Sequence, residues 1–126
     1  MRLQLDLSKE YGIVLEGGGA KGAFANLEKH KGNTPRINGE FWVGWFDHWG
    51  KPKNGGSTEG FNRDLKWMLE NNVSPNLFMV HGGTSFGFMN GANWEGAYTP
   101  DVTNYDYGAP ISENGTLTDR YRTFRQ

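Results

Sequence analysis

Apolar and polar positions along this chain predict strands and helices in alternation. Residues 11–15 form a short apolar run, and a glycine-rich stretch after them leads into a helix expected over residues 23–31. A second apolar run covers residues 37–43, and Pro35 marks the loop before it. Strand, helix and strand in this order are typical of a parallel βαβ unit.

The alternation continues in the second half of the chain. Ser57 or Thr58 is expected to cap a helix that runs to about Asn71, because its apolar side chains recur on one helical face. These apolar positions are Phe61, Leu65, Met68 and Leu69. Residues 76–80 are expected to form the next strand. The pattern therefore predicts an α/β fold.

Two further segments complete the predicted organisation. Residues 81–110 are rich in glycine and aromatic residues and are expected to form a long loop, and loops of this length in compact domains are usually functional. Residues 116–119 are expected to open a final helix. With 19 glycines in 126 residues, about twice the usual ~7%, long shaped loops are expected throughout.

Composition narrows the classes of function. The net charge is −1 and no basic stripe is present, which argues against a nucleic-acid partner. No cysteine is available for disulfides or thiolate sites, and the three histidines share no metal-ligand spacing, so neither a metal nor a cofactor is expected. No apolar run is long enough to span a membrane and no signal peptide is recognised, so the localisation stays unknown, with the cytoplasm as the default expectation.

The segment with the most chemistry is Gly-Glu-Phe-Trp-Val-Gly-Trp-Phe-Asp-His-Trp-Gly, residues 39–50. It places three tryptophans, two carboxylates and a histidine within twelve residues. Aromatic planes cover the apolar face of a sugar, and carboxylates meet its hydroxyls. Glu40 stands where a catalytic carboxylate at a strand end would be expected.

This segment resembles the nucleophile segment of glycoside hydrolase family 35, the retaining β-galactosidases. Residues 76–93 (NLFMVHGGTSFGFMNGAN) and residues 103–113 (TNYDYGAPISE) are similar to the segments that come after it in that family. The resemblance covers residues 35–126 in order and with natural spacing.

The resemblance implies a fold and a reaction. Family 35 enzymes are built on a (β/α)8 barrel of about 250 residues, so residues 35–126 would be the C-terminal portion of such a TIM barrel. It implies Glu40 as the nucleophile that forms a covalent galactosyl-enzyme, with Tyr107, Phe78 and Trp42 as substrate-binding residues. The partner would be a β-galactoside or galactose.

One part of the family's machinery is missing from these 126 residues. The family's proton donor lies in an Asn-Glu-Tyr-Gly motif that does not occur here, and Glu16 is the one carboxylate that could by accident face Glu40 across a small sheet. One carboxylate cannot act as both acid and nucleophile. The isolated chain is therefore expected to be inactive.

The N-terminal part carries a different resemblance. Residues 11–24 (YGIVLEGGGAKGAF) are similar to the opening strand and glycine loop of patatin-like phospholipases, which implies an oxyanion loop at Gly17, Gly18 and Gly19. Residues 1–34 are accordingly expected to be foreign to residues 35–126. The same glycines also fit a dinucleotide fingerprint, but the chain is too short for the usual doubled fold.

Two other functions stay open at this point. A patatin-like lipid acyl hydrolase would use Ser85, which lies in a G-x-S-x-G motif, although the Asp-Gly pair of the patatin dyad is absent from the sequence. The chain could instead be a non-catalytic galactose-binding fragment or a chimera. A partial barrel would also expose sheet edges, so self-association is expected.

Overall fold

The computed structural model describes residues 13–16, 19–31, 35–54, 58–94 and 96–126. The chain divides into two compact units. We call residues 1–42 and 58–78 the sheet unit, and residues 43–57 and 79–126 the loop unit.

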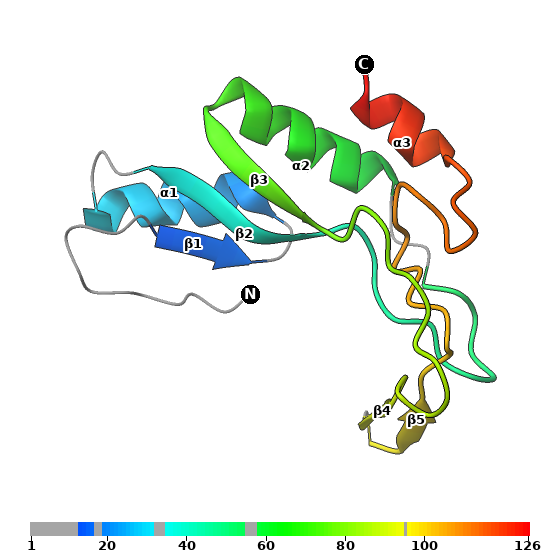
Figure 1. Cartoon of the computed structure of the whole chain (residues 1–126). Helices are drawn as coiled ribbons and strands as arrows, with labels where there is room; N and C mark the ends of the chain where they lie inside the picture. The colour runs from blue at the N-terminus through cyan, green and yellow to red at the C-terminus, as the bar shows by residue number, and fades with distance from the viewer. Residues whose placement is uncertain (1–12, 17–18, 32–34, 55–57, 95) are drawn as a thin grey trace. The chain divides into compact units, whose positions relative to one another are not determined.

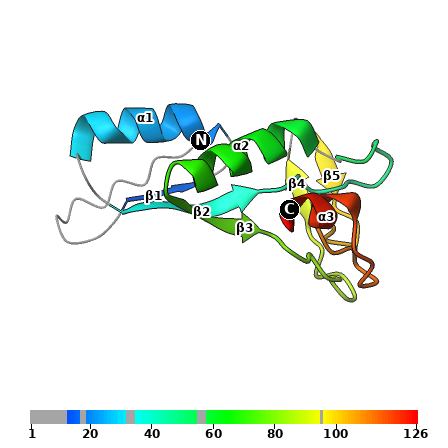
Figure 2. The ribbon, with the colours of Figure 1, turned by 90° about the horizontal axis from the view of Figure 1, so that it is seen from above.

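The sheet unit is a three-stranded parallel sheet with two helices. Its strands are β1 (Ile13–Glu16), β2 (Arg36–Trp42) and β3 (Val73–Phe78), in the order β1-β2-β3. The helices α1 (Ala20–Lys31) and α2 (Thr58–Glu70) connect them, and both lie on one face of the sheet (Figures 1 and 2). The expected α/β class and parallel βαβ arrangement are confirmed for this unit.

Aromatic side chains fill the space between the helices and the sheet. The ring of Phe41 in β2 stacks on Phe61 of α2 with centroids 4.4 Å apart, and Phe24 of α1 lies 6.3 Å from Trp67. Among the side chains that the structure describes in this unit, the buried apolar ones are Ala20, Ala23, Phe24, Leu27, Phe41, Phe61, Met68 and Val73. The helical period therefore identified two of the buried contacts of α2, at Phe61 and Met68.

Two element boundaries differ from the expectation. Helix α1 begins at Ala20 rather than residue 23, because the exposed Gly22 has open space around it and does not interrupt the helix. Strand β3 covers Val73–Phe78 rather than residues 76–80. The expectation started too late because Pro75 suggests a loop, whereas proline is tolerated in strands at sheet edges and bulges.

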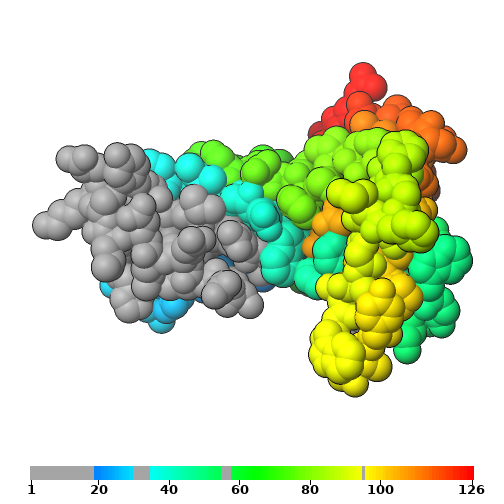
Figure 3. Space-filling view, turned by 60° about the horizontal axis from the view of Figure 1, so that its bottom comes forward, coloured from blue at the N-terminus to red at the C-terminus, as the bar shows by residue number. Residues whose placement is uncertain are grey.

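The loop unit contains a short hairpin and one short helix. Strands β4 (Ala92–Trp94) and β5 (Tyr98–Pro100) pair antiparallel, and α3 covers Asp119–Phe124 with Thr118 as its N-cap. Ala92, Trp94 and Tyr98 of the hairpin, which is yellow in Figure 3, are exposed. Gly96, between the strands, has φ +79°, a conformation that favours glycine.

The expectation that residues 81–110 form only a loop is therefore wrong in part. Each strand of the hairpin has three residues, which is too short to show a period of two. Buried Thr99 helps to close the hairpin, since its Oγ1 donates to the carbonyl of Asn93 at 2.9 Å.

Candidate active site

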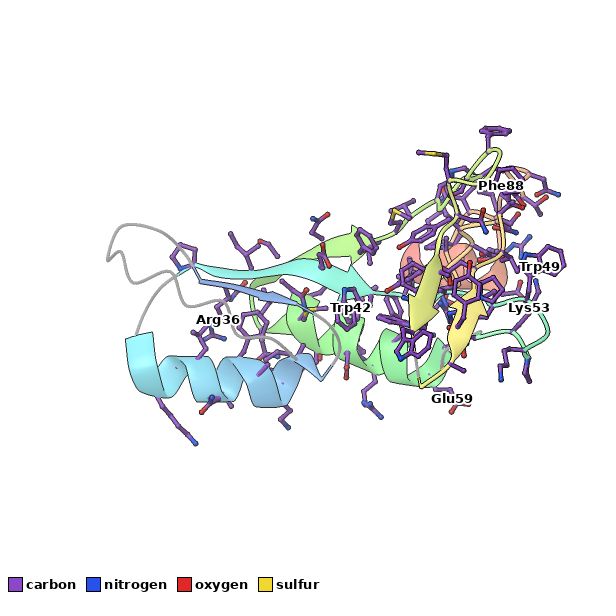
Figure 4. All side chains as sticks on the ribbon, turned by 90° about the horizontal axis from the view of Figure 1, so that it is seen from below. Arg36, Trp42, Trp49, Lys53, Glu59 and Phe88 are labelled. Atoms are coloured by element: carbon purple, nitrogen blue, oxygen red, sulfur yellow. The ribbon has the colours of Figure 1, made fainter. Side chains whose placement is uncertain are left out.

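Glu40 lies near the C-terminal end of β2, and its carboxylate is held by a tryptophan. The indole Nε1–H of Trp42, two residues further along the strand, donates to Glu40 Oε2 at 3.1 Å. Residues two apart in a strand share one face, so this contact follows from strand geometry. Figure 4 shows Trp42 at the end of the strand. The predicted nucleophile and one predicted substrate-binding residue are thus in direct contact.

Neighbouring strand ends bring two further residues close to this pair. The Cα partner of Trp42 on β3 is Phe78, which is half-buried, and the Cα partner of Glu40 on β1 is Glu16. Carboxyl ends of parallel strands meet at one edge of a sheet, where α/β proteins place their sites. Three of the predicted residues, Glu40, Trp42 and Phe78, therefore lie at one edge of the sheet unit.

Tyr107 belongs to the loop unit, where it sits in a cluster of aromatic rings. It is 4% exposed and has φ +56°, an uncommon backbone conformation for a non-glycine residue. Its ring stacks on Tyr105 with centroids 5.3 Å apart and meets Phe46 edge-on at 5.3 Å and Trp45 at 5.9 Å. Several ring contacts of this kind together can hold the uncommon backbone conformation of Tyr107 in place.

A buried arginine ties down the main chain next to Tyr107. The guanidinium of Arg120 donates from Nη1 to the carbonyls of Val43 and Gly108, and the residue is 6% exposed. Burial lowers the pKa of Arg120, and the negative charge of Asp106 opposes that shift. Nothing in the sequence pattern singled this residue out, because an arginine near a chain end is usually a solvated charge.

Two glycines allow the main chains of the loop unit to touch. A Cβ on Gly44 would lie 2.0 Å from the carbonyl oxygen of Tyr107, and a Cβ on Gly82 would lie 1.3 Å from that of Tyr105. No side chain fits at either position. The high glycine content was a signal of such close approaches, but it did not say which glycines make them.

His48 is a buried hydrogen-bonding residue of the loop unit. Its Nε2 lies 3.0 Å from Asp101 Oδ1 and 3.0 Å from Asn93 Oδ1, and its main chain pairs with that of Asp101. Trp49 next to it is 64% exposed (Figure 4). In the described ranges, no group of three or more His, Asp or Glu side chains is arranged to hold a metal ion.

The proposed oxyanion loop is only partly described. Gly17 and Gly18 lie outside the described residues, while the N–H of Gly19 donates to Asp64 Oδ2 at 2.9 Å. The anion at this N–H of the glycine loop is thus a carboxylate of the chain itself. The role of Gly17, Gly18 and Gly19 stays a prediction.

Ser85 is held through its main chain. Its N–H donates to the carbonyl of Thr103 at 2.8 Å, and the neighbouring Thr84 forms a main-chain bridge with Asn104. Its predicted role as an acyl nucleophile is not tested by this geometry. In the part of the chain that the structure describes, no helix has the length and hydrophobicity required to cross a membrane.

Comparison with known proteins gives consistent results. The family model for glycosyl hydrolases family 35 matches residues 6–126. A β-galactosidase of Xanthomonas manihotis is 45% identical over 112 residues, which are 86% of this chain and 19% of that protein. The human β-galactosidase is 44% identical over 103 residues, 82% of this chain and 15% of the relative. The mouse β-galactosidase-1-like protein is 39% identical over 102 residues, 81% of this chain and 16% of the relative.

These matches cover nearly all of the chain but only a small part of each relative. The chain spans between 15% and 19% of the length of these relatives. The family match also runs through residues 11–24, so it overlaps the patatin-like segment, and the separate origin of residues 1–34 stays a prediction. The family model matches nearly all of the chain, and the three relatives are 39% to 45% identical to it. Together these matches establish the family. The chain belongs to glycosyl hydrolases family 35.

Proposed function

We propose that this chain is the nucleophile-bearing part of a retaining β-galactosidase, and that Glu40 is the nucleophile. The observation that carries the proposal is the Glu40–Trp42 pair at the C-terminal end of a parallel strand. Catalytic groups of (β/α)8 barrels come from such strand ends. Support also comes from the relatives, since those of Xanthomonas manihotis and human are β-galactosidases by name.

The proposal includes the finer fold. The sheet unit, with three parallel strands and helices on one face, has the arrangement of consecutive βα units of a TIM barrel. In this proposal the strands are successive barrel strands and the helices belong to the outer ring. Glu40 and Trp42 would then face the mouth of the barrel.

The chemistry assigns a separate task to each oxygen of Glu40. Trp42 Nε1–H fixes the rotation of the carboxylate by binding Oε2, and we assign Oε1 to the attack on the anomeric carbon. A covalent galactosyl ester forms at that oxygen as the bond to the leaving group breaks. Tyr107 and Phe78 keep the substrate-contacting roles that the family resemblance implies.

The chain is expected not to hydrolyse unactivated galactosides. Their leaving oxygen needs a proton from a second carboxyl group, and the Asn-Glu-Tyr-Gly motif that supplies it in the family is absent from these residues. An aryl galactoside with a dinitrophenolate leaving group needs no such proton. It therefore tests the nucleophile alone.

The test is the reaction of this chain with dinitrophenyl β-galactoside in the presence of azide. Azide needs no general base, so it can release galactose from the ester, and two displacements return the β configuration. We expect β-galactosyl azide from the natural chain and none from Glu40→Gln. Formation of the α-azide, or equal product from Glu40→Gln, would contradict the proposal.

A further inference from the structure

Strand β2 contains an extra residue directly at Glu40. On the side of β1, Leu15 pairs with Asn38 and the next residue, Glu16, pairs with Glu40. Both neighbouring strands show the same shift, because on β3 the register jumps between the partners of Asn38 and Phe41. One additional residue of β2 therefore bulges out of the ladder in the segment between Asn38 and Phe41.

This bulge decides which face of the sheet carries Glu40. Asn38 and Phe41 are each 1% exposed, although they are three residues apart, and Phe41 packs on the helix side against Phe61. In a regular strand Glu40 would share the face of Asn38, because the side-chain period is two. With the extra residue, Asn38 and Phe41 share one face, and Glu40 lies with its hydrogen-bond partner Trp42 on the other.

A side chain of β3 holds the bulge. Asn76 Nδ2 donates to the carbonyl oxygen of Gly39 at 2.8 Å, one residue before Glu40. Its neighbour Pro75 is the Cα partner of Asn38 and has no N–H to give to the ladder at this place. The amide of Asn76 thus supplies a donor to β2 where the main chain of β3 lacks one.

We propose that Asn76 is a positioning residue for Glu40: by binding Gly39 O it fixes the bulge that places the Glu40 carboxylate on the face opposite to Asn38. This inference rests on the proposed function only in making Glu40 a nucleophile. The placement of the carboxylate can be measured without any sugar. Asn76 touches neither substrate nor carboxylate and acts through the main chain of Gly39.

The measurement is the pH titration of the Trp42 indole N–H resonance by NMR of the full chain. Because the indole binds the Glu40 carboxylate, its resonance should follow the ionisation of Glu40, and Glu40→Gln should remove that titration. Trp42→Phe assigns the resonance among the five tryptophans. We expect Asn76→Leu, a neutral side chain of similar size, to shift the Trp42 indole resonance and change its titration, because the Glu40–Trp42 pair changes its face of the sheet, while the other indole resonances stay in place.

A matched control uses the same substitution in the same unit. Asn71 Nδ2 also donates to a carbonyl, that of Trp67 at 2.8 Å, but at the end of α2. Asn71→Leu should leave the titration of the Trp42 indole unchanged. If Asn76→Leu does not fold, Asn76→Asp, which keeps the size of the side chain but as a carboxylate cannot donate, should show the same change in its place.

A second readout separates this inference from the proposed function. The rate of covalent labelling of Glu40 by a fluorinated galactoside should fall on the order of 100-fold in Asn76→Leu, as expected for a misplaced reacting group. A natural chain whose indole titrates but that is never labelled supports the positioning and overturns the nucleophile. A folded Asn76→Leu chain with unchanged titration and labelling overturns the role of Asn76.

Discussion

Single residues of the loop unit hold main-chain segments that have no regular secondary structure around them. Arg120 does so from inside the unit, where its guanidinium donates to the carbonyls of Val43 and Gly108. A buried carbonyl without a donor costs free energy, so removal of the donor costs more than one surface hydrogen bond. We therefore treat Arg120 as a residue on which the position of Tyr107 depends.

Replacement of Arg120 by alanine is expected to lower the free energy of unfolding by about 3 kcal/mol, because two carbonyls lose a charged donor. The measurement is chemical denaturation followed by tryptophan fluorescence. Arg122→Ala is the control, since Arg122 is exposed and forms an ion pair with exposed Asp119, and such pairs contribute less than about 1 kcal/mol. Equal effects of the two substitutions would refute the structural role of Arg120.

Glycines provide a second pair of substitutions with opposite signs. Gly44→Ala places a Cβ 2.0 Å from the carbonyl of Tyr107 and should destabilise the chain by on the order of 3 kcal/mol. Gly22→Ala meets nothing within 4 Å in α1 and should stabilise it by up to about 1 kcal/mol. Thermal unfolding of both variants measures these changes in stability. An unchanged stability of Gly44→Ala would show that the close approach does not exist.

Helix α2 packs one of its faces against the rest of the sheet unit. Its Met68 is fully buried at 0% exposure, whereas the adjacent Leu69 is 61% exposed. Met68→Ala should cost about 2–5 kcal/mol through lost contacts and a cavity, while Leu69→Ala should cost less than about 1 kcal/mol. Denaturant midpoints of the two variants test the orientation of the helix, and a reversed order would place the wrong face against the sheet.

At this scale the sequence predicted regular elements better than irregular ones. The helical period of α2 was visible because it repeats over about two turns, and the order of strand and helix followed from it. The β4–β5 hairpin was missed because strands of three residues have no readable period. The bulge in β2 was also missed, since only pairing with both neighbours reveals that a residue is extra.

The candidate site likewise contains residues that the sequence indicated and residues that it did not. The strand-end position of Glu40 follows from the sequence pattern, and the family resemblance named Trp42 and Phe78, which lie next to it; the roles of these residues stay predictions. Asn76 and Arg120 act on carbonyls far away in the sequence, at separations of 37 residues for Asn76 and 77 for Arg120 with Val43. No local pattern encodes such contacts.

For the molecule as a whole, self-association stays a prediction. The described sheet has β1 and β3 at its edges, and unpaired strands can pair with other chains. Large apolar side chains are also exposed on the loop unit. They include Phe86, Phe88, Met89, Trp94 and Tyr98, and Phe88 is labelled in Figure 4.

Sedimentation velocity over a concentration series is the test of this prediction. We expect species larger than the monomer that dissociate on dilution. Ser74→Lys places a charge on exposed β3 and should weaken association, whereas Thr123→Lys, with the same charge on exposed α3, should not. A monodisperse monomer that unfolds cooperatively would contradict the expectation.

The central claim is that Glu40 is a glycosidic nucleophile, and covalent labelling tests it most directly. The chain is incubated with a fluorinated galactoside that carries a dinitrophenolate leaving group, digested, and mapped by mass spectrometry. We predict one galactosyl ester, on the peptide that contains Glu40, and no label in Glu40→Gln. A label on another residue such as Ser85, or no label on a chain shown to be folded, would contradict the claim.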